Sequence, residues 1–222
     1  MGTARLLEAR GHEALLDPVL EIRRLPVSPP SLEGVGAIVV TSANAVAAIA
    51  ALPAGLPVFA VGAATAAAAR AAGRAAVHAA AGDGADLTRL VARSLPAGAG
   101  TILHLAGGDV REGLEASLTG AGYRYRSVVV YEAVPVAEMA PEAAAALAAR
   151  QVGAVLLYSP RSAELWARRV EAEGLADMLG GTLAACLSDA VAAPLARLPL
   201  HSVKVARSRD QNALLRCLDG RW

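Results

Sequence analysis

Short apolar segments alternate with helical segments along most of the chain, and this alternation restricts the fold more than any other feature. In the middle third, each apolar run ends in a turn rich in Ser, Thr, Gly or Asp, and a helical pattern follows. Four such units predict a parallel sheet with helices on both faces. Right-handed crossovers place every strand-to-helix turn at the carboxyl edge of that sheet. The predicted strands span residues 35–40, 57–61, 75–78 and 101–105, and the predicted helices span 44–51, 65–72, 86–94 and 110–120.

The last third of the chain repeats the same pattern. The turn Val61-Gly62-Ala63-Ala64 matches Leu187-Ser188-Asp189-Ala190, and Val77 lies as far beyond Val61 as Val203 lies beyond Leu187. Such self-similarity predicts two copies of one α/β unit. The predicted strands of the second copy span residues 154–158, 182–187 and 201–206, with helices up to about residue 172, at 190–197 and at 210–218.

Two segments that end in proline separate the halves. Val19–Pro26 and Val128–Pro135 are short and apolar, and proline ends each as a donor to a strand ladder. We interpret them as connector strands between two domains, and Tyr131 would face the cleft between those domains. The predicted division is a discontinuous domain (1–18 plus 137–222), an inserted domain (33–125) and connectors at 19–32 and 126–136.

The first residues do not follow the α/β pattern. Thr3–Arg10 is typical of the end of a helix that Gly11 closes, and His12–Leu16 is predicted as a short strand. Because α/β proteins usually open with a buried strand, we expect that one strand and the front of its helix are missing from this chain.

Composition limits the classes of function. Hydrophobic residues make up 55% of the 222 residues but aromatic residues only 3%, so Ala, Val and Leu must build the core. A net charge of +1 without a basic tract argues against a nucleic-acid partner. The two cysteines form no Cys-x-x-Cys motif, and no apolar run of about 18 residues suggests a membrane span. With no signal peptide visible, we expect a cytoplasmic protein without a membrane partner.

Five turns at predicted helix starts could bind anions. Free backbone N–H groups and the positive helix end favour anions there, and hydroxyl groups add donors. At any single turn, plain helix capping explains the residues better. Five turns around one cleft favour a ligand with several carboxylates or phosphates, and no motif for a nucleotide cofactor is present. The turns are Thr41-Ser42, Gly62, Gly107-Gly108-Asp109, Ser159-Pro160 and Ser188-Asp189.

Other reactive side chains give weaker signals. The four histidines are scattered over predicted strands, and this pattern is more typical of core or edge residues than of metal ligands, so we predict no metal site. Cys186 lies inside a strand and is expected to be a small core residue. Arg111 and Arg161 follow two of the turns, where each could clamp a carboxylate or remain a solvated helix residue.

Six segments, in order along nearly the whole chain, resemble uroporphyrinogen-III synthase. The resemblance implies two similar parallel-sheet domains, flavodoxin-like and HemD-like, joined by a two-stranded connector. It also implies a cofactor-free lyase of tetrapyrrole synthesis, which feeds the haem, cobalamin and chlorophyll type of product. The segments are 41–46, 61–66, 105–111, 130–135, 158–163 and 186–192.

The family's substrate is hydroxymethylbilane, a linear tetrapyrrole with eight carboxylates. Loss of its terminal hydroxyl as water gives an azafulvene, and the last pyrrole ring is then attacked at its substituted carbon. The resulting spiro intermediate allows inversion of that ring and closure to uroporphyrinogen III, whereas the free substrate closes without inversion to isomer I. The resemblance therefore implies that the enzyme mainly holds the substrate in one reactive geometry.

The resemblance also assigns roles to single residues. Tyr131 matches a tyrosine that assists departure of the hydroxyl, and a phenol stays protonated at neutral pH and can donate. The alternative is a connector aromatic without chemical role. We expect a monomer that meets hydroxymethylbilane synthase only transiently. Ser42, Ser159 and Ser188 match turns that contact the substrate mostly through backbone. The full set of residues expected to bind substrate is Ser42, Gly62, Thr65, Gly107, Arg111, Ser159, Arg161 and Ser188.

One departure and two alternatives remain at this point. The family usually opens with a strand that ends in Thr-Arg-Pro or similar, and its loss would leave an unpaired sheet edge and exposed apolar surface. A non-catalytic binding module for a polycarboxylate, or a degenerate synthase homologue, is the main alternative. A response-regulator-like domain is weaker, because Asp109 and Asp189 alone do not supply an acidic cluster.

Overall fold

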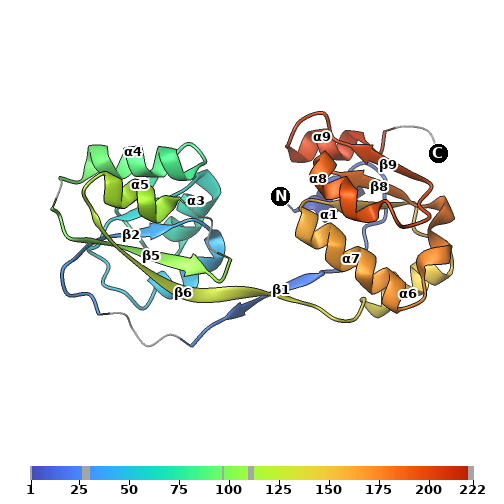
Figure 1. The fold of residues 1–222 in the computed structure, drawn as a ribbon, viewed down its shortest axis with the longest axis horizontal. Helices are drawn as coiled ribbons and strands as arrows, with labels where there is room; N and C mark the ends of the chain where they lie inside the picture. Colours follow the sequence, from blue (N-terminus) through green and yellow to red (C-terminus); the bar gives the residue numbers. More distant parts are fainter. Residues whose placement is uncertain (1, 27–30, 97, 110–112, 220–222) are drawn as a thin grey trace. The chain divides into compact units, whose positions relative to one another are not determined.

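The computed structural model describes residues 2–26, 31–96, 98–109 and 113–219 (Figure 1). The chain divides into two compact units, which we call unit 1 (Met1–Glu21 with Pro135–Trp222) and unit 2 (Ile22–Val134). Among the described residues, none of the helices combines the length and the hydropathy that crossing a bilayer requires.

Unit 2 is built on a six-stranded sheet whose strand order is β1-β6-β5-β2-β3-β4. The four strand pairs from β6 to β4 are parallel, as the alternation of apolar and helical segments predicted. The strands are β1 (Leu20–Arg24), β2 (Val35–Val40), β3 (Val58–Ala60), β4 (Val77–Ala79), β5 (Thr101–Gly107) and β6 (Arg124–Pro135).

Helices cover both faces of this sheet, because residues of a buried strand point alternately to either side. Ala37 and Val39 pack with α4 (Gly84–Ser94) and α5 (Leu114–Gly120). Ile38 and Val40 pack on the other face with α2 (Val46–Ile49) and α3 (Ala63–Ala71). The helix predicted at 44–51 is shorter, since its first turn is the 3-10 helix η1 (Ala43–Ala45).

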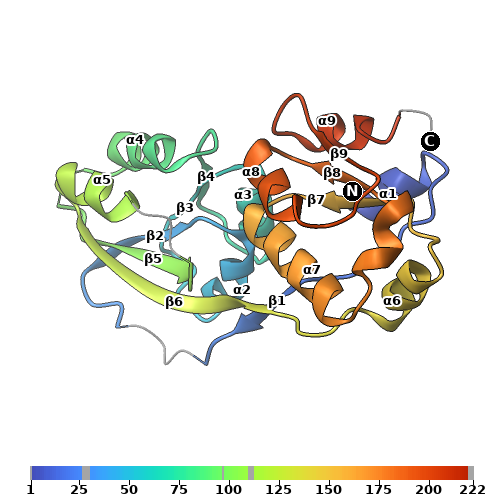
Figure 2. The ribbon, with the colours of Figure 1, turned by 45° about the vertical axis from the view of Figure 1, so that its right-hand side comes forward.

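Unit 1 has a smaller sheet with the order β7-β8-β9, also parallel (Figure 2). Its strands are β7 (Ala154–Leu157), β8 (Leu183–Cys186) and β9 (Ser202–Val205). One apolar cluster joins a sheet face to α6 (Pro141–Ala148), α7 (Pro160–Ala172), η2 (Ala176–Gly181), α8 (Asp189–Ala192) and η3 (Ala193–Leu195). The other face packs against α1 (Thr3–Glu8) and α9 (Gln211–Arg216).

The strand predicted at His12–Leu16 is wrong, because these residues form no regular element. The chain folds back after α1, where the N–H of His12 donates to the carbonyl of Leu7 (3.1 Å). Beyond it, Asp17 accepts from the N–H of Ala140 (2.9 Å) and forms an ion pair with Arg169, so this segment is held by side chains rather than by a strand ladder.

The two segments predicted as connectors pair with each other. The N–H of Leu25 donates to Val130 (3.0 Å) and the N–H of Val136 donates to Val19 (3.1 Å), so β1 and β6 run antiparallel. The predicted limits of the domains and connectors, at residues 18, 33, 125 and 137, stay a proposal.

Candidate functional site

Tyr131 lies on β6 beside the carboxyl end of β5. The register of these two strands shifts between Ala106 and Gly107, so that Ala106 pairs with Val129 but Gly107 pairs with Tyr131. The N–H of Gly108 donates to the carbonyl of Tyr131 (2.9 Å). The partly buried ring packs against the apolar cluster under α2 and α3, which leaves a phenol next to the turn that follows β5.

A polar network centred on the buried His104 lies in the same sheet; the sequence predicted a core or edge histidine there but not its partners. His104 on β5 is only 2% exposed; its Nε2 is 3.2 Å from the Thr41 hydroxyl and its Nδ1 is 2.7 Å from the Tyr125 hydroxyl. Burial lowers the pKa of His104 to about 4, so the ring is neutral at pH 7. The sequence feature that could have revealed this network is a polar residue on each of three segments that are neighbours in a parallel sheet.

The predicted turns of unit 2 gather at the carboxyl edge of its sheet. The Ser42 hydroxyl caps η1 by accepting from the N–H of Asn44 (3.2 Å), so this side chain has the plain capping role. Gly62 is the N-cap of α3, with an extended backbone, so no side chain caps this helix. Thr65, one turn into α3, is buried at 7% exposure. Arg111 lies outside the described residues.

The predicted turns of unit 1 lie at the carboxyl edge of its own sheet. The Ser159 hydroxyl caps α7 by accepting from the N–H of Ser162 (3.1 Å), and its own proton is directed at the Ser162 oxygen (2.8 Å). Ser188 is the extended N-cap of α8 and makes no side-chain capping bond. Arg161 is exposed in the first turn of α7. Each edge can therefore offer backbone N–H groups to anionic groups of a ligand.

Neither a cluster of metal ligands nor a reactive thiol at Cys186 is found among the described residues. No group of three or more His, Cys, Asp or Glu side chains that could hold a metal occurs in the described ranges. Cys186 is fully buried in β8, and burial raises the pKa of its thiol to about 11. It therefore packs as a small core residue and would not be a thiolate at neutral pH.

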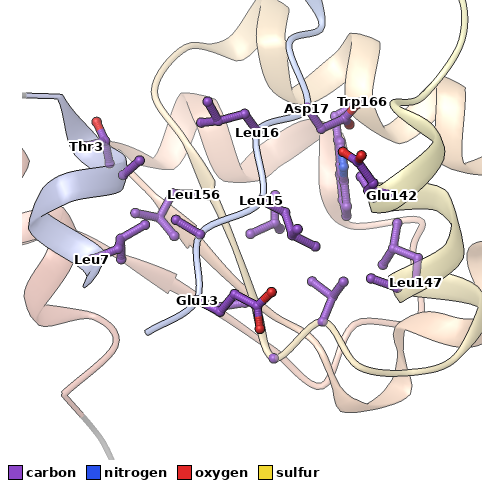
Figure 3. A pocket seen from close by; sticks show the side chains of 18 of the residues that line it. Thr3, Leu7, Glu13, Leu15, Leu16, Asp17, Glu142, Leu147, Leu156 and Trp166 are labelled. Carbon is purple, nitrogen blue, oxygen red and sulfur yellow. The ribbon is translucent and has the colours of Figure 1, made fainter. Parts of the chain in front are cut away.

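A large apolar hollow lies within unit 1, and none of the predicted site residues that the structure describes lines it, although Tyr158 and Ser162 beside Ser159 do. We call it the β7 hollow: it has a volume of about 1310 Å³ and is lined by β7, by the chain from His12 to Leu20, and by α1 and α6. Figure 3 shows leucine side chains and Trp166 around it, together with the carboxylates of Glu13 and Glu142. Such a lining does not suit a polycarboxylate, so we do not assign the substrate to it.

Comparisons with known proteins agree on one family. The family model of uroporphyrinogen-III synthase HemD matches residues 2–216. No curated protein sequence is significantly similar to the chain.

Among solved structures, uroporphyrinogen-III synthetase from Helicobacter pylori has a TM-score of 0.63 at 15% identity, covering 90% of this chain and 89% of that chain. A mutant uroporphyrinogen III synthase from the extremely thermophilic bacterium Thermus thermophilus has a TM-score of 0.49 at 21% identity, covering 98% of this chain and 92% of that chain. The Helicobacter likeness shows the α/β fold. Because the family model spans nearly the entire sequence, the chain belongs to the uroporphyrinogen-III synthase family.

Proposed function

We propose that this protein converts hydroxymethylbilane to uroporphyrinogen III, with inversion of the last pyrrole ring, ring closure and loss of water. The observation that carries this proposal is the family match over residues 2–216. Membership of this family makes the protein a lyase-type enzyme of tetrapyrrole synthesis. The proposal goes further in assigning the step to particular side chains and in requiring no cofactor.

Tyr131 is the proposed proton donor. Its hydroxyl would give a proton to the terminal hydroxyl of the substrate as that C–O bond breaks, so that water leaves and the azafulvene forms. A proton released when the macrocycle closes would restore the phenol. Its place beside the end of β5 supports the role, because β5 ends at Gly107, at the carboxyl edge of a parallel sheet.

The turns at the carboxyl edge of each unit are the proposed binding groups for the substrate's carboxylates. In unit 2 these are the starts of η1 and α3, with Ser42, Gly62 and Thr65; in unit 1 they are the starts of α7 and α8, with Ser159 and Ser188. Because the hydroxyls of Ser42 and Ser159 already cap helices, backbone N–H groups carry more of this task than side chains. Arg161 and Arg111 would add bidentate contacts. A monomer in the cytoplasm, with transient contact to hydroxymethylbilane synthase, stays a prediction.

A coupled assay tests the function. Hydroxymethylbilane is generated in situ by its own synthase, this protein is added, and the oxidised porphyrin isomers are separated by chromatography. We expect mostly isomer III, against isomer I in the absence of the protein. Only isomer I from a sample whose circular dichroism shows a folded protein would contradict the proposal and favour a binding module without chemistry.

The role of Tyr131 is tested in the same assay with Tyr131→Phe. Loss of a positioned acid should lower kcat by roughly 10²–10⁴-fold. Tyr123→Phe is the matched control: it removes a phenol from the same unit, where the Tyr123 hydroxyl donates to the carbonyl of Leu95 (2.7 Å) on the opposite face of the sheet. Equal activity of Tyr131→Phe and wild type would remove Tyr131 from the mechanism.

A further inference from the structure

Tyr131 points to an unexpected face of the sheet. Residues of a strand alternate between faces, so Val130 and Tyr131 should point to opposite sides. Both nevertheless pack against the cluster that contains Val40 and Leu105. The register shift between Ala106 and Gly107 explains this, because an extra residue in one strand turns the side chains that follow it. The bulge therefore brings the phenol onto the face that α2 and α3 cover.

Gly107 provides the space that the turned ring occupies. A Cβ atom at position 107 would lie 2.6 Å from Cζ, 2.7 Å from the hydroxyl oxygen and 2.9 Å from Cε2 of Tyr131. Non-bonded carbon atoms are most favourable at about 3.5–4.0 Å, so a Cβ at position 107 would force the Tyr131 ring to shift. Gly107 does not have a positive φ, and the requirement is therefore for a missing side chain rather than for unusual backbone.

This requirement is specific to position 107. One residue on, a Cβ at Gly108 would lie 3.5 Å from the Cβ of Glu132, which is an ordinary contact. The N–H of Gly108 also fixes the Tyr131 backbone through its bond to the carbonyl (2.9 Å). If a side chain were added at 107, the ring of Tyr131 would therefore move while its backbone stays.

We propose that Gly107 is the positioning residue for Tyr131: the absence of a side chain there lets the phenol lie across the end of β5, where its hydroxyl reaches the leaving group of the substrate. This rests on the proposed function, in which the Tyr131 hydroxyl gives a proton to the departing hydroxyl as the C–O bond breaks. Gly107 thus acts through Tyr131 and needs no contact of its own with the substrate.

The first test is Gly107→Ala in the coupled assay. Displacing a reacting group by about 1 Å can cost 10²-fold, so we expect kcat to fall by about 10²-fold with KM changed less than threefold. Gly55→Ala is the matched control, because Gly55 lies in the same unit, has no positive φ and has nothing within 4 Å of an added Cβ. A similar loss of kcat in both variants, or a change in KM alone, would overturn the proposal.

A double-mutant cycle separates the two roles that Gly107 could have. In a Tyr131→Phe background the proton donor is already gone, so Gly107→Ala should lower kcat by less than twofold further. An undiminished 10²-fold loss in that background would mean that Gly107 acts on the substrate directly, and would overturn the proposal. If wild type gives only isomer I, the proposed function fails, and the steric step is still tested by the next measurement.

A spectroscopic measurement tests the positioning without activity. In protein labelled with ¹³C-tyrosine, the Tyr131 signal is assigned by its loss in Tyr131→Phe. We expect this signal to shift in Gly107→Ala and to stay in Gly55→Ala; an unshifted signal in Gly107→Ala would contradict the proposal. Should Gly107→Ala fail to fold, Gly107→Ala/Tyr131→Ala removes the ring, and we expect it to fold. A double variant that still fails to fold would equally refute the steric pairing.

Discussion

The two sheets of this protein are built from similar strand-and-helix units but are not equally complete. In unit 2, β2 lies between β5 and β3, and Ile38, Val39 and Val40 are fully buried. In unit 1, β7 has β8 as its one partner among the described strands, and all four of its residues line the β7 hollow (Figure 3). Leu15 and Leu16, which also line this hollow, are 45% and 73% exposed. The same strand-and-helix pattern thus yields one sheet with a filled centre and one with an open edge.

A buried arginine joins two distant segments of unit 1. Arg169 on α7 is 4% exposed; it forms an ion pair with Asp17 and donates to the carbonyls of Glu138 (3.0 Å) and Pro18 (3.3 Å). These partners lie where the chain leaves unit 1 and where it returns. Apolar clusters cover both sheets, and in unit 1 a buried arginine also joins the segment that leaves the unit to the segment that returns.

The largest expected effect is on unit 1. Arg169→Ala would leave Asp17 without its partner and two carbonyls without a donor, and should lower the free energy of unfolding by about 3–5 kcal/mol. The control is its neighbour, Arg168→Ala, whose solvent-exposed pair with Glu164 should contribute little to stability. Trp166 lies on α7 of unit 1, and the sequence has no tryptophan between Ile22 and Val134, so tryptophan fluorescence during urea unfolding does not report on unit 2. Equal urea midpoints for Arg169→Ala and Arg168→Ala would mean that the buried arginine contributes no more to the stability of unit 1 than the exposed one.

The next effect contrasts the two sheets directly. Ile38→Ala deletes a fully buried side chain from the centre of unit 2 and should cost about 2–5 kcal/mol, because the cavity cannot collapse. Leu156→Ala on β7 removes a partly buried side chain that already borders a hollow, and should cost about 1 kcal/mol. Urea unfolding followed by circular dichroism and by tryptophan fluorescence measures both. A larger cost for Leu156→Ala would mean that β7 is as well packed as β2.

The third effect is a pH dependence confined to unit 2. Burial lowers the pKa of His104 from 6.5 to about 4. The unfolded chain therefore binds a proton more readily than the folded chain, so stability is full above about pH 6.5 and falls as the pH drops toward 4. Between pH 7.5 and 5 the expected loss is about 2 kcal/mol.

Unfolding of His104→Gln at these two pH values tests this dependence. We expect its pH slope to flatten, whereas His201→Gln, an exposed residue of unit 1, should keep the slope of the wild type. A His104→Gln variant that loses as much stability as the wild type on acidification would assign the effect to other groups.

The sequence predicted those parts of the fold that depend on local pattern. The apolar run at residues 35–40 is a buried strand because each residue of a central parallel strand meets a covered face. The same reasoning failed at His12–Leu16, which forms no ladder with any strand that the structure describes. An apolar run therefore forms a strand only where another strand pairs with it.

The finer features of the site depend on contacts that no local pattern contains. Asp17 and Arg169 are far apart in the chain, and the His104 network requires three segments in register. The sequence and its family resemblance pointed to Tyr131 and Gly107 separately. The register shift that sets one against the other appears only in the folded sheet.

The smallest expected effect concerns the apolar surface of the β7 hollow. Leu16→Ser replaces a side chain that is 73% exposed, so the free energy of unfolding should change by no more than about 0.5 kcal/mol. Binding of an apolar fluorescent dye should nevertheless fall about twofold, because such dyes report exposed apolar surface. Val129→Thr, at a 38% exposed position of unit 2 outside the hollow, is the control and should leave dye binding unchanged. If both substitutions lower dye binding alike, then exposed apolar surface is spread over both units, and the open edge of β7 is not what distinguishes unit 1 from unit 2.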